Sequence, residues 1–399
     1  MRTALLCATG FIALGTAHAE PVRLTPSLEA RLRFEHVAQE GIALDADATT
    51  LRLRPGVIAS AGNWSLLGES EGVLALGGDY FDGTNGRSRY PLIADPQNLE
   101  LNRLQLRYAG KTATGTIGRQ RLNLSDDRFV GTAPWRQSEQ TYDAARLQWG
   151  RPGGLRADIA YSWSVRTVNG RNGKGARPQA IGGDNIFALL SYGGPALDVT
   201  AFAYLVDQDA PAVQGYRLSS QTYGLRATGR LPVGRDITLA YQASWARQSD
   251  WRRNPNDFAA DYRLGEVSLT GARLGLTGGV ETLGADRGVA LTSVQTPLAS
   301  HFRFNGWAGK FVTTPPDGLR DIYGSINWRR QGRTASVNAG ATWHHFSSDR
   351  DRRSYGEEID LIAGTSYRHC ALSARCAHYE AKGFATDTDK LWVQMDWSL

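Results

Sequence analysis

The sequence lacks the long apolar runs that membrane-spanning helices need. No run of about 20 apolar residues follows the N-terminus, and the mean hydropathy is −0.36. These features exclude a bundle of transmembrane helices. They leave a transmembrane β-barrel open, because each strand of a barrel needs only one apolar residue in two. The 45 Gly, 11 Trp and 15 Tyr are typical of such barrels.

Lysine is scarce. It occurs only at positions 111, 174, 310, 382 and 390, so 40 of the 45 basic residues are arginines. The net charge is +6. A guanidinium group is planar and binds carboxylate or phosphate through two parallel hydrogen bonds. The composition therefore indicates recognition of anionic groups, and we predict neither a nucleic-acid partner nor a cofactor.

Cysteine is also rare, with one residue near the N-terminus and two near the C-terminus. The spacing of Cys370 and Cys376 suits two residues that face each other across a tight hairpin. No cluster of His or Cys residues stands near enough to complete a tetrahedral metal site. We therefore predict a disulfide in an oxidising compartment and no metal.

The N-terminus has the features of a secretory leader. Arg2 precedes an apolar stretch over residues 4–14, and Ala17-His18-Ala19 forms a small-x-small cleavage site. The apolar stretch is too short for a membrane anchor, and no stop-transfer charges follow it. We predict a cleaved signal peptide over residues 1–19 and a single mature domain over residues 20–399.

Apolar residues in the mature chain recur with a period of two, which is the pattern of β-strands. In the clearest segment Leu155, Ala157, Ile159, Tyr161, Trp163 and Val165 alternate with Arg156, Asp158, Ser162, Ser164 and Arg166. A soluble sandwich also alternates. The apolar faces repeatedly end in Trp or Tyr, however, and the polar faces carry Arg, as in outer-membrane barrels. The C-terminal segment, residues 391–399, alternates in the same way.

The connections predict the number of strands. Short turns alternate with nine long polar segments, at residues 38–48, 81–97, 122–139, 168–184, 207–217, 249–258, 284–319, 347–355 and 381–388. Nine hairpins give 18 strands, and 16 strands stay open. We expect an all-β, antiparallel transmembrane barrel with short periplasmic turns and long extracellular loops, in the outer membrane of a Gram-negative bacterium. Lipid cannot satisfy a free sheet edge, so the chain must form one closed sheet.

A barrel of this size leaves an aqueous lumen. Its predicted inner face carries Arg31, Arg33, Arg52, Arg54, Arg103, Arg107, Arg146, Arg156 and Arg166. Fixed positive charge there would attract anions. In an alternative interpretation, these arginines pair with acidic residues and only stabilise a polar wall. The acidic candidates are Glu29, Glu35, Glu100, Asp143 and Asp158.

Two polar stretches carry a resemblance to a known family. Residues 118–131 read GRQRLNLSDDRFVG, and residues 135–143 read WRQSEQTYD. Further along, the chain has GVETLG at 279–284, QTPLA at 295–299, GWA at 306–308 and TPPDGLRD at 314–321. These segments, in this order, resemble the alginate export porin family.

The resemblance implies an 18-stranded outer-membrane channel whose arginine-rich constriction passes an anionic uronate polymer by diffusion. It implies Arg119, Arg121, Arg128 and Arg136 as constriction cations and Asp126, Asp127 and Glu139 as their acidic partners. The best-known exporters of the family are longer than this chain and have plugging loops. The direction of transport, export or uptake, therefore stays open.

We predict a passive channel for alginate or its oligouronates. The alternative is a general anion-selective porin for small organic acids, and a third hypothesis is a barrel whose loops serve adhesion or catalysis. The expected partners are outer-membrane lipid, the anionic polysaccharide and periplasmic proteins that handle it. We do not expect an enzyme, because neighbouring residues of a strand, such as His344 and His345, point to opposite faces.

Overall fold

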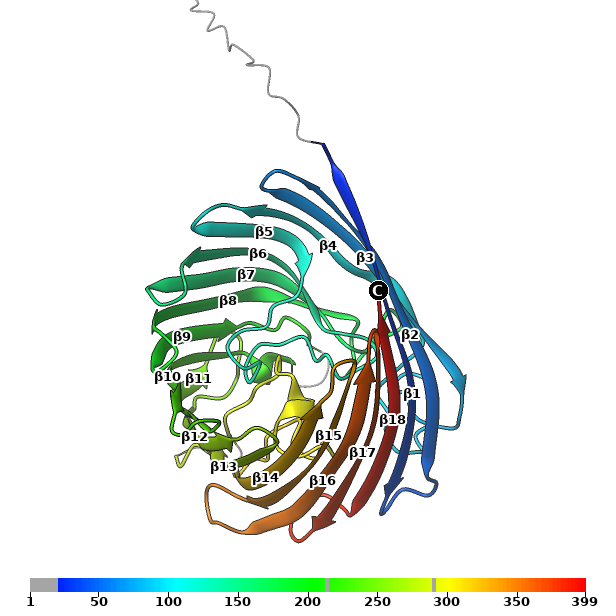
Figure 1. Ribbon diagram of the computed structural model, residues 1–399. Coiled ribbons are helices and arrows are strands. Elements are labelled where there is room, and N and C mark those ends of the chain that lie inside the picture. Colours follow the sequence, from blue (N-terminus) through cyan, green and yellow to red (C-terminus); the bar gives the residue numbers. More distant parts are fainter. Residues whose placement is uncertain (1–20, 212–214, 289–291) are drawn as a thin grey trace, which may run out of the picture.

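The computed structural model describes residues 21–211, 215–288 and 292–399, and these form one antiparallel sheet of 18 strands (Figure 1). In chain order the strands are β1 (Arg23–Gln39), β2 (Ala46–Ala61), β3 (Trp64–Gly77), β4 (Asn98–Ala109), β5 (Ala113–Gln120), β6 (Thr141–Gly150), β7 (Arg156–Arg166), β8 (Ala180–Gly193), β9 (Asp198–Val206), β10 (Ser220–Pro232), β11 (Thr238–Asp250), β12 (Ala259–Thr270), β13 (Leu274–Leu283), β14 (Leu319–Gln331), β15 (Ala335–Ser347), β16 (Ser354–Tyr367), β17 (Cys370–Ala381) and β18 (Thr388–Ser398). Two short 3-10 helices, η1 (Gly215–Leu218) and η2 (His301–Arg303), lie in loops.

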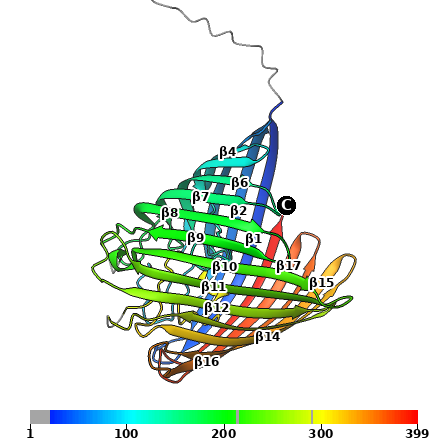
Figure 2. The same cartoon turned by 90° about the vertical axis from the view of Figure 1, so that its left-hand side faces the viewer.

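The sheet closes on itself. Each strand pairs with its neighbours in the sequence, and β1 pairs with β18 from Glu29↔Ser398 to Gln39↔Thr388. Neighbouring strands run side by side at a common tilt (Figure 2). The prediction of a closed all-β barrel with 18 strands is confirmed. In the described part of the chain no helix has the length and apolarity needed to cross a membrane.

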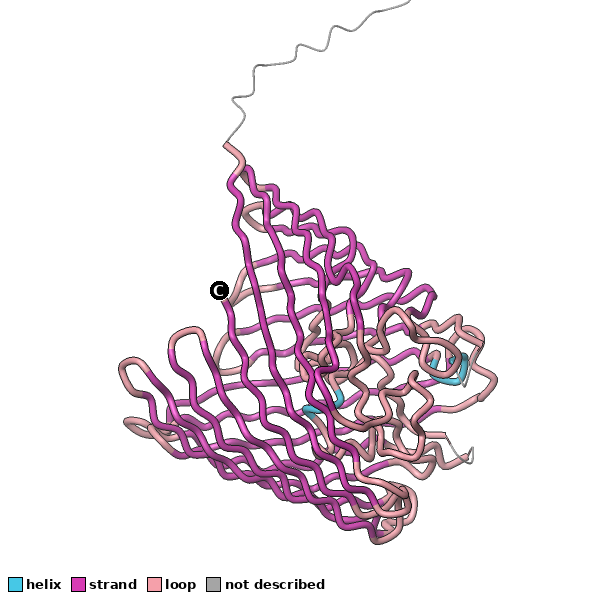
Figure 3. Tube along the Cα trace, turned by 90° about the vertical axis from the view of Figure 1, so that its right-hand side faces the viewer, coloured by secondary structure: helices cyan, strands magenta, loops and turns pink. Residues whose placement is uncertain are grey.

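Long connections gather at one end of the barrel, and many fold back toward its interior (Figure 3). They span residues 40–45, 78–97, 121–140, 167–179, 207–219, 251–258, 284–318, 348–353 and 382–387. At the other end, connections of two to five residues join the strands. The nine long loops therefore match the predicted ones to within a few residues. The predicted signal peptide, residues 1–19, lies outside the described residues.

The outer wall is apolar and the inner wall is polar. Along β1, Leu32 and Phe34 are 38% and 37% exposed, while the alternating Arg33 and Glu35 are 1% and 3% exposed. Exposed aromatic residues mark both ends of the outer wall. Toward the turns they are Trp64, Tyr108, Trp149, Tyr192, Trp328 and Tyr367; toward the loops they are Tyr161, Trp163, Tyr223, Trp245 and Trp343. This is the surface that a lipid bilayer requires.

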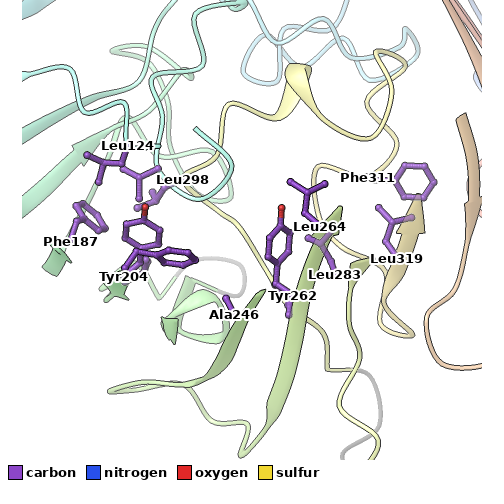
Figure 4. Close-up of a cluster of buried hydrophobic side chains, with 14 of the residues drawn as sticks. Leu124, Phe187, Tyr204, Ala246, Tyr262, Leu264, Leu283, Leu298, Phe311 and Leu319 are labelled. Atoms are coloured by element: carbon purple, nitrogen blue, oxygen red, sulfur yellow. The ribbon is translucent and has the colours of Figure 1, made fainter. Parts of the chain in front are cut away.

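A hydrophobic cluster lies inside the barrel and joins the inner wall to two long loops (Figure 4). Leu124 and Leu298 come from the loops, whereas Tyr204 and Tyr262 come from β9 and β12. All four side chains are almost fully buried. The lumen is therefore narrowed by folded loops with a core of their own.

The predicted disulfide is wrong. Cys370 and Cys376 both lie on β17, and neither is bonded to the other. At about 3.3 Å per residue, six residues of strand separate them by roughly 20 Å. The turn that we expected between them is instead at residues 368–369, before Cys370.

Two free thiols follow from this placement. A chain expressed from residue 20 should show two reactive thiols after unfolding, because neither cysteine has a partner within reach. Thiol titration with and without reductant should give the same count. A count that rises only after reduction would contradict the strand register of β17.

Candidate functional site

Two long loops meet inside the barrel and form its constriction. We call residues 121–140 inner loop 1 and residues 284–318 inner loop 2. Their backbones pair between Val130 and Leu298. The Gly131 N–H donates to the Leu298 carbonyl at 2.9 Å, and the Ser300 N–H donates to the Asp127 carbonyl at 3.0 Å. The two loops therefore act as one unit across the lumen.

Arg128 fixes inner loop 1 to the barrel wall. Its guanidinium is buried and lies 2.7 Å from Glu281 of β13. It also donates to Thr296 at 3.2 Å and to Asn305 at 3.0 Å, both in inner loop 2. Tyr262 donates to the same Glu281 at 2.8 Å. The predicted constriction cation is thus an anchor whose donors are occupied by the protein itself.

The other end of inner loop 1 is held by β2, β3 and β4. Glu139 lies 2.7 Å from Arg121 and 3.2 Å from Arg54, and it accepts a hydrogen bond from Asn102 at 2.7 Å. Burial alone would raise the pKa of Glu139, but the two guanidinium groups hold this pKa below its ordinary value. Glu139 therefore stays ionised in its buried position. Its predicted pairing with a constriction arginine is present.

Arginines of β1 bind the middle of inner loop 1. Arg33 donates to the Trp135 carbonyl at 2.5 Å and contacts Asp95 at 3.1 Å. Arg31 donates to the Pro134 carbonyl at 3.0 Å. Such bonds satisfy carbonyl groups that a loop buried in the lumen would otherwise leave without partners. These arginines do face inward, as predicted, but they hold the loop in place.

The other two acidic residues of inner loop 1 are paired as well. Asp126 forms an ion pair with Arg226 of β10, and Asp127 contacts Arg303 of inner loop 2 at 3.1 Å. Both partners were absent from the predicted set. Because they lie about 100 and 176 residues further along the chain, local sequence spacing carries no signal for them.

Inner loop 2 is attached to β16 and β14. The Ala308 N–H donates to Glu358 at 2.6 Å, and the Trp307 N–H donates to Asp360 at 3.2 Å. Gly306 has a φ of 81°, and a Cβ there would collide with the Glu358 carboxylate. Only glycine meets both conditions. Asn305 adds a 3.1 Å bond to Asp321 of β14.

Several predicted wall arginines form ion pairs between strands. The pairs are Arg103 with Glu69, Arg146 with Asp158, Arg156 with Asp198, Arg166 with Glu100, and Arg54 with Glu71. The interpretation in which acidic partners stabilise a polar wall is therefore confirmed for Asp158 and Glu100. Arg107 has no ion pair within the described ranges and is exposed.

The prediction that Arg119 lines the lumen is wrong. Its register partner on β4 is Leu104, an outward residue, whereas the next residue, Gln120, is buried inside. Arg119 binds Asp143 of β6 at 2.7 and 3.0 Å and the Leu101 carbonyl at 3.0 Å. Residues 98–103 of β4 pair only with β3, because β5 ends at Gln120 and the chain turns into the barrel (Figure 1). Arg119 thus bridges the uncovered edge of β4 from outside.

A cluster of arginine donors in the lumen is left without partners. Arg52 is 3% exposed, and its Nε and Nη1 have no hydrogen-bond partner. Its nearest carboxylate is Glu29, 3.7 Å away. Arg375 of β17 likewise has an unpartnered Nε. Arg136 of inner loop 1 has no ion pair among the residues that the structure describes. Arg31 acts electrostatically on both Arg52 and Arg375, so the arginines form one positive region.

Aromatic rings of both inner loops line this region. Trp135 and Phe302 stack at 3.7 Å with an interplanar angle of 8°, and Phe302 stacks on Trp307 at 5.6 Å. The Arg375 guanidinium lies 4.5 Å from the Trp135 ring and 5.0 Å from the Trp307 ring. Arg52, Arg136, Arg375 and these three rings are together called the basic aromatic site.

Sequence reasoning missed Arg375. It shares the inner phase of β17 with the buried Ala377 and Tyr379. Small residues dominate this strand, so its alternation is weak. The phase could have been found by counting back from Tyr379, but the rings that cover Arg375 come from loops, and their positions follow from tertiary structure alone.

Solved structures of other proteins have the same fold. No family model matches the chain, and no curated protein matches it. The chain is similar over 96% of its length to OccAB4 of Acinetobacter baumannii, covering 100% of that chain with a TM-score of 0.71 and 11% identity. It is similar over 94% of its length to OpdL of Pseudomonas aeruginosa, covering 98% of that chain with a TM-score of 0.67 and 14% identity. The chain has the fold of the Opd and Occ porins. OpdK of Pseudomonas aeruginosa, solved with vanillate, matches with a TM-score of 0.66 and 12% identity, covering 94% of this chain and 98% of that one.

These identities establish a shared architecture. They do not extend the resemblance to the alginate export porins, which stays a prediction. The Opd and Occ likeness supports a porin barrel, and the substrate has to be argued from the lumen itself.

The Arg128 anchor can be tested by removing its charge. Arg128→Met leaves Glu281 buried without its guanidinium, which should cost roughly 3–5 kcal/mol of stability. Inner loop 1 should detach from β13, so single-channel conductance in planar bilayers should rise. The double variant Arg128→Met/Glu281→Leu should recover much of the stability, since no charge is then left unpaired. An unchanged conductance in the single variant would show that inner loop 1 does not narrow the pore.

Because Arg119 lies on the outer face, its removal should lower stability and leave ion selectivity unchanged. Arg119→Ala removes two bonds to Asp143 and one to the Leu101 carbonyl, with an expected cost of roughly 1–3 kcal/mol. The temperature at which the barrel loses its heat-modifiable migration on gels should fall. Ion selectivity should stay at the wild-type value, and a reduced preference for anions would instead place Arg119 in the lumen.

Proposed function

We propose that the protein is a passive channel of the bacterial outer membrane that passes small organic anions. The observation that carries this proposal is that two arginines of the inner wall lack a close carboxylate: Arg52 lies 3.7 Å from Glu29 and Arg375 forms no ion pair among the described residues. Most other arginines of the inner wall are neutralised by carboxylates. Positive charge that no carboxylate offsets therefore lies on the inner wall, with Arg375 beside the rings of the inner loops.

The outer surface supports the membrane location. Apolar residues alternate outward around the wall, and aromatic residues mark both ends of the apolar band. Long loops lie at one end and short turns at the other. In barrels of this kind the short turns face the periplasm. The N-terminal leader predicted from the sequence agrees with export to this membrane.

The basic aromatic site favours carboxylates that carry a flat group. Free guanidinium donors bind a carboxylate through two parallel hydrogen bonds. The Trp135, Phe302 and Trp307 rings offer an apolar surface beside Arg375. An aromatic acid fits both features at once. The structure of OpdK with vanillate shows that a porin of this fold has been solved with a compound of this kind.

The inner loops favour small substrates over a polymer. They contact each other across the lumen and are bound to β1, β2 and β10 on one set of walls and to β13, β14 and β16 on others. A polysaccharide needs a continuous, straight path through the lumen, and inner loops that are bound to several parts of the wall narrow this path. We therefore prefer small organic acids to alginate, and oligouronate becomes a comparison in the test.

The experiment is ion selectivity in planar bilayers. Wild-type protein should prefer anions, and Arg52→Gln/Arg375→Gln should lower the anion to cation permeability ratio by roughly fivefold per arginine at low salt, since a charge about 8 Å from an ion in water contributes roughly 0.5 kcal/mol of opposite sign for the anion and the cation. The matched control is Arg235→Gln, in a short turn outside the lumen. A cation-selective wild-type channel would overturn the proposal.

The same bilayers separate the candidate substrates. An aromatic monocarboxylate should reduce the current through the wild-type channel at concentrations at which its uncharged amide has no effect. Block by oligouronate but not by the small acid would favour the alginate hypothesis. Loss of block in the Arg52→Gln/Arg375→Gln variant locates the binding at the basic aromatic site.

A further inference from the structure

A group of arginines lies on the outer wall, at the loop end of β11 to β14. Arg247 of β11 pairs in register with Asp261 of β12, and Arg263 of β12 pairs with Thr282 of β13. Thr282 in turn pairs with Arg320 of β14. Residues that are opposite in an antiparallel register share one face of the sheet. The three arginines therefore lie on the same face.

That face is the outer one. The neighbours Tyr262, Leu283 and Leu319 are each buried inside the barrel, and successive side chains of a strand alternate between faces. Trp245, an exposed residue of the aromatic band, is the register partner of Arg263. Tyr223, another member of this band, is the partner of Arg247. The arginines thus begin at the level where the apolar wall meets the polar zone.

Loops complete a pocket at this place. It has a volume of about 470 Å³ and is lined by Arg247, Asp261, Arg263 and Thr282, with Asp286, Arg287, Asp349 and Arg352 from the loops. Arg247 and Arg263 share the single carboxylate of Asp261, at 3.0 Å each. Their side chains remain 53% and 63% exposed. Each guanidinium has five N–H donors, so most of their donors point to the surroundings.

The rest of the outer rim is different. On the strands around β1, β15 and β17 the corresponding outward positions hold pairs of histidine and carboxylate: His36 with Asp47, His345 with Glu357, and His378 with Asp389. Lys382 also contacts Glu357. On the β11 to β14 side, five arginines stand beside the three carboxylates of Asp261, Asp286 and Asp349. This surface is called the rim arginine patch and comprises Arg247, Arg263, Arg287, Arg320 and Arg352.

We propose that the rim arginine patch binds the phosphate groups of lipopolysaccharide, the anionic glycolipid of the outer leaflet. Arginine forms two parallel hydrogen bonds with phosphate. Directly below the patch the same wall exposes Val267, Val280 and Ile326. These side chains form an apolar surface that acyl chains can contact. A single amphiphile with phosphates above and acyl chains below meets both surfaces. The inference rests on the proposed membrane location and is independent of what the channel transports.

The test uses the full-length mature protein, folded in a neutral detergent, with bisphosphorylated lipid A as the probe. Lipid A should raise the temperature at which the heat-modifiable band is lost. In Arg247→Gln/Arg263→Gln/Arg320→Gln, the lipid A concentration required should increase roughly tenfold or more. The matched control is Arg329→Gln/Arg330→Gln/Arg333→Gln at the turn end, which removes the same charge and should respond like the wild type.

Further arms identify the ligand. Dephosphorylated lipid A that stabilises the wild type equally would overturn phosphate recognition, and inorganic phosphate that reproduces the whole effect would overturn the lipid as its source. If lipid A stabilises the triple variant as it does the wild type, the rim arginine patch is not the binding site. The single variant Arg263→Gln, which removes one exposed charge, should show a smaller loss even if the triple variant does not fold. Anion selectivity should be unchanged in both variants, so a failure of this proposal is distinguishable from a failure of the channel proposal.

Discussion

The narrowed lumen depends on the pairing of buried arginines with carboxylates and carbonyls. Two long loops fold into a space that water would otherwise fill, and their backbone groups need partners there. Arg33 and Arg54 donate to loop carbonyls and Arg128 donates to loop side chains, and each of the three also contacts a carboxylate. A lysine carries its three N–H donors on one nitrogen and lacks the planar fork with which a guanidinium bonds two elements from separate nitrogens. The scarcity of lysine is thus explained largely by architecture.

Pairing with carboxylates distinguishes the arginines that stabilise the wall from those whose charge acts on a solute in the lumen. Arg103 and Arg146 add little to the field of the lumen, since Glu69 and Asp158 lie beside them. Arg52 and Arg375 differ because part of each guanidinium has no partner. The proposed selectivity for anions therefore depends on a few positions. The count of arginines along the wall overstates the charge that a passing solute encounters.

The fold was predictable because lipid imposes a simple rule on every strand. One residue in two must be apolar, so the alternation around Leu155 to Val165 and the nine long loops were enough to predict 18 strands. The constriction was harder to predict from the sequence. Arg121 and Glu139 could be placed together through a resemblance, but the partners of Arg128 and Asp127 come from distant segments. The assignment of Arg119 to the lumen was wrong because it came from the resemblance, whereas alternation along β5 puts Arg119 on the outer face with the exposed Ile117. The predicted disulfide was wrong because the turn lies before Cys370, and the spacing of two cysteines does not show where a turn lies.

The attachment of the inner loops to opposite walls has a mechanical consequence. Inner loop 1 is bound to β13 through Arg128 and to β2 through Arg54, and inner loop 2 is bound to β16. Together the two loops link distant parts of the barrel wall across the lumen. Because the same loops form the constriction, the contacts that hold the cross-section of the barrel also set the width of the passage.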